Sequence, residues 1–164
     1  MPDQSNSYTF NGSFSNQDTK ADAWSIGTAK EAKSGRQLIA RYRSFQPTNI
    51  KSSDYPHPIA FSWQFESETG MPSKNVKQRM NYLEETFEKV LESANAGFLI
   101  GLVTGNGRAE WLFYARDRDE FMHLLNSSFP SGEMFPINVS HLGIDPDWSA
   151  FQQMQKTYNQ PPRT

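Results

Sequence analysis

Residues 97–117 read GFLIGLVTGNGRAEWLFYARD, and this stretch decides the fold. Residues 98–103 are apolar on both faces, and a second run follows at 110–115, which is apolar after Glu110. Between the two runs lies Thr104-Gly105-Asn106-Gly107, in which the Asn-Gly pair tolerates the positive φ values of a tight turn. The stretch therefore predicts a β-hairpin.

Helices are predicted on both sides of this hairpin along the chain. Before it, apolar residues recur every three or four positions from a Ser73 cap to Gly97, as in one long amphipathic helix. After it, Asp117-Arg118-Asp119-Glu120 has the pattern of a capping box that opens a second helix.

Two further strands complete the pattern. Large apolar residues alternate with small or polar ones from Ile59 to Glu66, which indicates a strand with one buried face. The last strand, 135–144, contains Pro136, which cannot donate to a ladder and so favours a sheet edge. The order from residue 57 predicts an α+β fold, a ferredoxin-like βαββαβ antiparallel sheet with both helices on one face.

In that arrangement the strand 98–103 would form the opposite edge, where a strand that is apolar on both faces promotes aggregation. Segments 22–30 and 36–46 predict an N-terminal β-hairpin, which we expect to cover this edge. A homodimer through a sheet edge is the alternative. Arg41 and Arg43 share one face of the second segment, and we expect that face to be solvated.

A short C-terminal helix extends the domain. Asp145 is its predicted N-cap and Pro146 its first residue. Four residues form its predicted inner face: Trp148, Phe151, Gln155 and Tyr158.

Residues 22–158 are predicted to form a single domain. Residues 1–21 and 159–164 hold few apolar side chains, so we expect flexible N-terminal and C-terminal tails. Within the first tail, residues 8–15 have the alternative pattern of a small hairpin around Asn11-Gly12.

The composition disfavours nucleic-acid binding and excludes chemistry that needs cysteine. The chain has 164 residues with 16 Lys+Arg and 18 Asp+Glu, a formal net charge of −2. This balance disfavours nucleic acid as a partner, because neutralising phosphates needs a positive excess. The absence of cysteine excludes disulfides and thiolate metal sites and favours a cytoplasmic location. Because no apolar stretch is long enough to cross a membrane, we expect no membrane association.

We expect no catalytic, cofactor-binding or metal-binding residues. The three histidines, His57, His123 and His141, have no second ligand at metal-site spacing. Glu120 and His123 form one E-x-x-H, whereas a dimetal carboxylate site needs two such motifs. The glycine turn at 104–107 opens a strand rather than a helix, which favours a hairpin turn over a phosphate-binding loop.

An acidic stripe is the first candidate partner-binding surface. Glu84, Glu88 and Glu92 recur every four residues along the long predicted helix. They could be offered to a basic partner. The alternative is a solvated face on which Glu85 and Lys89 pair.

Aromatic residues at 110–115 are the second candidate surface. Trp111 and Phe113 could lie on the open face of the sheet, or Leu112 and Tyr114 could do so if the strand has the opposite phase. Packing beneath the C-terminal helix is the alternative to an exposed site.

Several of these segments resemble a known bacterial family. The hairpin GFLIGLVTGNGRAEWLFYARD, the strand HPIAFSWQF and the closing DPDWSAFQQM are similar to domain of unknown function 695. The resemblance covers about residues 22–158 and implies a ferredoxin-like fold, related to regulator of ribonuclease E activity B. That regulator acts by binding a protein, and the family has no established catalytic residues to carry over.

We therefore expect a non-catalytic protein-binding or regulatory domain with a protein partner, and an immunity-type inhibitor is one form of it. The alternative is a small acid/base enzyme at the strand–helix junction 141–147. There Asp145 and Asp147 lie near His141 in the sequence.

Overall fold

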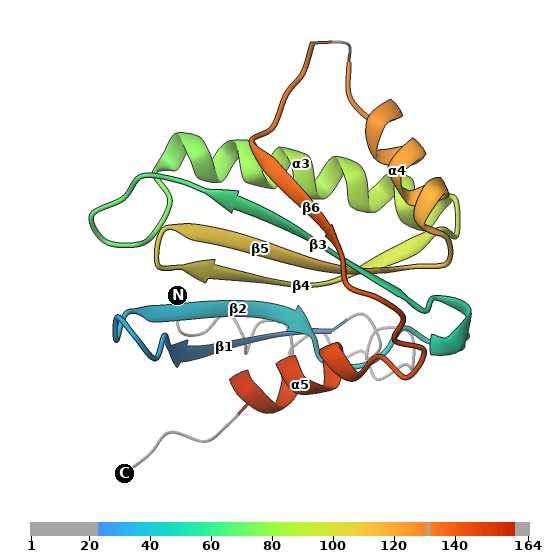
Figure 1. The fold of residues 1–164 in the computed structure, drawn as a ribbon, viewed down its shortest axis with the longest axis horizontal. Coiled ribbons are helices and arrows are strands. Elements are labelled where there is room, and N and C mark those ends of the chain that lie inside the picture. The colour runs from blue at the N-terminus through green and yellow to red at the C-terminus, as the bar shows by residue number, and fades with distance from the viewer. Residues whose placement is uncertain (1–22, 131, 160–164) are drawn as a thin grey trace.

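The computed structural model describes residues 23–130 and 132–159 (Figure 1). It contains a six-stranded antiparallel sheet with the strand order β1-β2-β4-β5-β3-β6. The strands are β1 (Trp24–Lys30), β2 (Gln37–Arg43), β3 (His57–Gln64), β4 (Gly97–Gly105), β5 (Arg108–Ala115) and β6 (Ile137–His141). The α-helices are α3 (Lys74–Ser93), α4 (Arg118–Ser127) and α5 (Ser149–Tyr158), and a 3-10 turn spans Ser52–Asp54.

The α+β class is confirmed, although the sheet has six strands where a βαββαβ unit alone would have four. The two additional strands are the N-terminal hairpin. β2 pairs with β4 in antiparallel register, with Tyr42 opposite Gly101 and Ile39 opposite Thr104. The prediction that this hairpin covers the apolar strand is therefore confirmed. Because that edge is paired within the chain, a homodimer through a sheet edge would have to use β1 or β6.

Local capping signals set the starts of α3 and α4. The Ser73 side chain accepts a hydrogen bond from the Val76 amide, and the Asp117 carboxylate accepts one from the Glu120 amide. α3 ends at Ser93, before Asn95 adopts a positive φ of 53°, so it is slightly shorter than predicted. The predicted last strand is also shorter, because Pro136 lies just before β6 rather than inside it.

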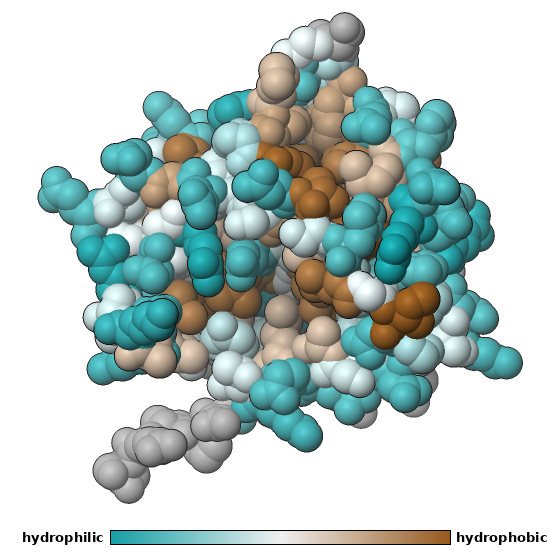
Figure 2. All heavy atoms as spheres, viewed as in Figure 1, coloured by the Kyte–Doolittle hydropathy of each residue, from teal (hydrophilic) through white to brown (hydrophobic). Residues whose placement is uncertain are grey.

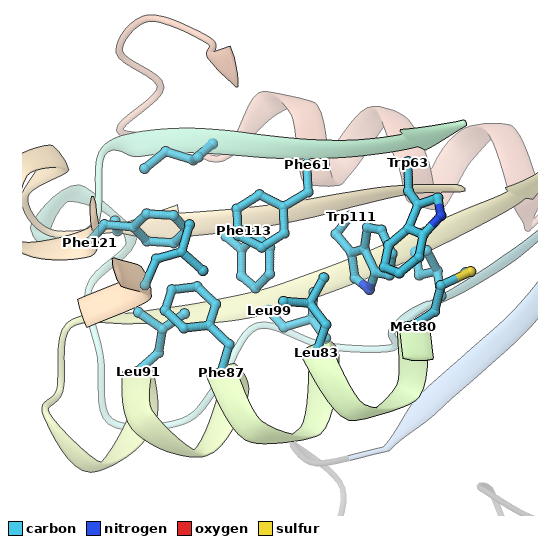
Figure 3. Close-up of a cluster of buried hydrophobic side chains, with 14 of the residues drawn as sticks. Phe61, Trp63, Met80, Leu83, Phe87, Leu91, Leu99, Trp111, Phe113 and Phe121 are labelled. Carbon is cyan, nitrogen blue, oxygen red and sulfur yellow. The ribbon is translucent and has the colours of Figure 1, made fainter. Parts of the chain in front are cut away.

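The main core lies between the sheet and the helices α3 and α4, as predicted. Its centre is a cluster of phenylalanines from β3, β5 and both helices (Figure 3). The ring of Phe61 lies 4.7 Å from that of Phe113, and the ring of Phe87 lies 5.0 Å from that of Phe121. The indoles of Trp63 and Trp111 extend the cluster along α3.

The opposite face of the sheet carries α5 (Figure 1). The ring of Trp148 stacks on Tyr114 with centroids 4.4 Å apart, and Phe151 packs beside it. The helix begins at Ser149, three residues later than predicted, because Trp148 adopts a left-handed conformation with φ 56°. Pro146 therefore lies in the preceding turn, and the prediction that it is the first helical residue is wrong.

The predictions for residues 1–21, including the hairpin at 8–15, fall outside the described residues, as do residues 160–164 of the second tail. Among the helices of the described residues, none is long and apolar enough to cross a membrane. Figure 2 shows that hydrophobic side chains reach the surface over and beside β6, within a face that is otherwise mostly hydrophilic.

Candidate binding groove

A groove of about 620 Å³ lies between α3 and the β1–β2 hairpin. It exists because the hairpin widens the sheet beyond the strands that α3 covers, so the flank of the helix and the hairpin form two walls. The lining is mixed. Its apolar part is Ile26, Ile39, Met71, Pro72 and Leu102, and its polar part includes Arg41, Lys77, Asn81, Glu84 and Glu85. We call this feature the α3–hairpin groove.

An ion pair between the two walls closes the floor of the groove. Arg41 Nη2 lies 2.7 Å from Oε1 and 2.6 Å from Oε2 of Glu84. The indole Nε1–H of Trp111 donates to the same carboxylate at 3.0 Å. The Glu84 carboxylate thus accepts hydrogen bonds from Arg41 of β2 and from Trp111 of the core, and the side chain is only 10% exposed.

Trp111 and Phe113 are both buried in the main core, at 1% relative exposure. The prediction that they form an exposed partner-binding patch is therefore wrong. The opposite phase of the strand turns Leu112 and Tyr114 towards α5, where Trp148 and Phe151 cover them. Within the described residues, neither face of β5 presents an aromatic patch to solvent.

Arg43 continues the charged contact between β2 and α3. Its guanidinium is buried, and Nε donates to the Leu99 carbonyl at 2.8 Å. Nη2 lies 3.0 Å from Glu92 and 3.7 Å from Glu88. The prediction of a solvated arginine face is therefore wrong, because the acidic side of α3 covers it.

The indole ring of Trp24 also contacts both arginines of β2. The guanidinium carbons of Arg41 and Arg43 lie 5.2 and 5.0 Å from the ring centroid of Trp24, within the range of cation–π attraction. Trp24 belongs to β1, so both strands of the hairpin take part in the charged contact with α3.

The acidic stripe thus has an intramolecular role. Its exposure rises along the helix, because the side chain of Glu84 is 10% exposed, that of Glu88 28% and that of Glu92 42%. Burial and the negative charge of Glu92 raise the pKa of Glu88 to about 7, although Arg43 opposes this. Glu84, Glu88 and Glu92 face the arginines of β2, so together they are not available to a basic partner. Glu85 and Lys89, by contrast, are exposed on the helix surface.

Lys77 has a different environment on the same wall. Within residues 23–130 and 132–159, no carboxylate lies within ion-pair distance of its ammonium group. Desolvation and the positive charge of Arg41 lower the pKa of Lys77, and the charge of Glu84 only partly offsets this. Among the described residues the groove therefore holds one ion pair, Arg41–Glu84, and two charged side chains outside any ion pair, Lys77 and Glu85.

The strand–helix junction 141–147 has a structural role in the described chain. The Asp145 carboxylate accepts hydrogen bonds from the Tyr114 hydroxyl at 2.7 Å and from the amides of Ser149 and Ala150 at 2.8 and 3.0 Å. Burial alone would raise the pKa of Asp145, but these hydrogen bonds hold it below its usual value. The oxygens of Asp145 are thereby engaged in capping α5, whereas His141 and Asp147 are exposed.

Other chemistry has little support in the described part of the chain. No group of three or more His, Cys, Asp or Glu residues is arranged there to hold a metal ion. Glu120 pairs with Arg116 at 2.8 Å, so its side chain is not oriented towards a metal site with His123. The α3–hairpin groove therefore remains the candidate site.

Comparison with protein-family models matches residues 34–154 to the family of unknown function DUF695. The chain belongs to the DUF695 family. The match covers β2 through most of α5, so in this DUF695 domain both Arg41 and the acidic side of α3 fall inside the family region. β1 lies before the matched region, with Ile26, which lines the groove, and Trp24, which contacts Arg41 and Arg43. Neither the curated proteins nor the solved structures gave a match.

Proposed function

We propose that this DUF695 domain is a non-catalytic protein-binding or regulatory domain, which takes a segment of a partner protein into the α3–hairpin groove. The observation that carries the proposal is the lining of the groove. Ile39 is 38% exposed there although it is a large aliphatic residue, and Lys77 lines the same groove. A lining that combines apolar side chains with a few charged groups is typical of recognition sites.

The fixed Arg41–Glu84 ion pair supports a binding role over a catalytic one. Glu84 accepts from both Arg41 and Trp111, so its oxygens are engaged and poorly placed to exchange a proton with a substrate. An immunity-type inhibitor, which neutralises a toxin by occupying its surface, is one form that such a domain can take.

We also propose that β3, α3, β4, β5, α4 and β6 form a ferredoxin-like unit, to which the β1–β2 hairpin and α5 are additions. The order β6-β3-β5-β4 within the sheet supports this, because it is the strand order of that topology. The expected relation to regulator of ribonuclease E activity B stays a prediction, which favours the same class of function.

The test is capture of a partner with a matched pair of variants. The tagged chain is incubated at low salt with extract of the cells that produce it, and stoichiometric binding is measured for the wild type, Ile39→Arg and Ile144→Arg. Both substitutions add an arginine at an exposed isoleucine, but Ile144 lies outside the groove, between β6 and α5.

We expect a partner that the wild type and Ile144→Arg retain and that Ile39→Arg binds about thirtyfold more weakly, which corresponds to a hot-spot loss of about 2 kcal/mol. Equal retention by Ile39→Arg would place the interaction elsewhere. If no stoichiometric partner is captured at low salt, where charged contacts are strongest, the binding role itself is wrong.

A further inference from the structure

The charges in the α3–hairpin groove are unevenly distributed along α3. At one end, the carboxylate of Glu84 is neutralised by Arg41. Lys77 lies seven residues earlier on the same helix, about 10 Å along the axis at 1.5 Å per residue. Because the Glu84 carboxylate is already paired with Arg41, its charge offsets that of Lys77 only in part.

The other groups that face Lys77 add little negative charge. Glu85 is exposed and lies one residue further from Lys77 than Glu84 does. The first turn of α3 has no acidic residue. The side chains that β1 and β4 contribute to the lining are uncharged. The end of the groove near the start of α3 is therefore positive.

The apolar part of the lining reaches the same end. Met71 and Pro72 precede the start of α3, and Ile26 and Ile39 line the groove from the hairpin. A ligand that fills the groove must bury these side chains while it approaches an ammonium group. A wholly apolar ligand would leave Lys77 desolvated without a counter-ion, which is unfavourable.

We infer that the groove recognises an acidic peptide segment of a partner protein, in which a Glu or Asp carboxylate pairs with Lys77 and neighbouring apolar side chains pack on Ile39. This inference rests on the proposed function and names the chemistry of the partner. The peptide carboxylate supplies a negative partner for the Lys77 ammonium group. The positive pole of the α3 dipole also favours a negative charge at this end of the groove.

The experiment uses the full chain and three blocked pentapeptides, acetyl-Ala-Leu-X-Leu-Ala-amide with X as Glu, Gln or Lys. Binding is followed by amide chemical-shift changes in NMR spectra, which also locate the contact. The variants are Lys77→Gln, Lys77→Arg and, as a matched control, Lys74→Gln. Lys74 is an exposed lysine one turn earlier that does not line the groove.

We expect the Glu peptide to shift groove residues and to bind at least fivefold more tightly than the Gln peptide, with the Lys peptide weakest. Lys77→Gln should abolish this preference, whereas Lys77→Arg and Lys74→Gln should retain it. Raising the salt concentration from 50 to 500 mM, chosen to screen the pair, should reduce the preference.

Equal binding of the Glu and Gln peptides in the groove would overturn the acidic preference and leave the proposed function standing. A Glu preference that survives in Lys77→Gln would also overturn the inference, as would equal shifts from free acetate or groove shifts that come from self-association of the chain. If no peptide shifts the groove and Ile39→Arg still captures the partner, both the inference and the proposed function fail.

Discussion

Removing the charge of Glu88 should change how the stability of the domain depends on pH. The carboxyl lies between α3 and β2, 3.7 Å from Arg43 and under the negative charge of Glu92. Burial and that charge raise its pKa from an ordinary value of 4.5 to about 7. Between these two pH values the folded chain keeps a proton that the unfolded chain has lost. Its contribution to stability is therefore full below pH 4.5 and is lost as the pH rises towards 7.

The size of the effect follows from the two pKa values, 4.5 and about 7. A difference of about 2.5 corresponds to an upper limit of about 3 kcal/mol. Because the side chain of Glu88 is 28% exposed, solvent screens part of this, and we expect a loss of roughly 1–2 kcal/mol between pH 5 and pH 8.

The assay is urea unfolding at pH 5 and pH 8, followed by tryptophan fluorescence, for the wild type, Glu88→Gln and Glu85→Gln. Glu85 is the matched control because it is exposed on the same helix. Glu88→Gln should lose this part of the pH dependence, and Glu85→Gln should behave as the wild type. If Glu88→Gln keeps the full loss of stability at pH 8, the reasoning about the buried charge is refuted.

Three further substitutions test other contacts by the same unfolding assay. Asp145→Ala should destabilise the chain by roughly 1–3 kcal/mol, because it removes the cap of α5 and the acceptor of a buried hydroxyl, whereas Asp147→Ala should change little. Gly27→Ala should cost about 1–3 kcal/mol, because the new Cβ would collide with the backbone carbonyl of Tyr158; full stability would mean that α5 does not approach β1 closely. Trp111→Phe should cost about 2–4 kcal/mol, because it leaves a cavity and removes a hydrogen bond to a partly buried carboxylate; a loss below 0.5 kcal/mol would contradict its place in the core.

Local patterns were sufficient to predict most elements of the fold. The Asn-Gly turn and the caps at Ser73 and Asp117 act within a few residues, so they can be recognised without knowledge of the rest of the chain. The edge position of β6 followed from Pro136, and the position of the N-terminal hairpin followed from the need to cover β4.

The phase of β5 could not be predicted from its sequence. Trp111, Leu112, Phe113 and Tyr114 are all large and apolar, so a period of two does not distinguish the faces. The phase is set in the assembled molecule, where Trp111 and Phe113 enter the main core while Leu112 and Tyr114 pack with Trp148 and Phe151.

The charged contact between β2 and α3 did have a signal, which was not recognised. Side chains two apart on a strand are about 6.6 Å apart, and those four apart on a helix are about 6 Å apart. Arg41 and Arg43 therefore match the spacing of Glu84 and Glu88, and Glu92 reaches Arg43 from the next turn of the helix. Two stripes of opposite charge with matched spacing predict a contact between their elements, whereas each stripe alone indicates a solvated face.

The close approach of Gly27 to Tyr158 joins the first strand of the described chain to its last helix. Contacts between segments so distant in sequence form slowly, because a long stretch of chain must be closed before they contribute. We therefore expect the β1–β2 hairpin and α5 to open as one cooperative unit with a common hydrogen-exchange rate. Opening of this unit would uncover the apolar edge of β4, so the same contact that completes folding also protects the protein from aggregation.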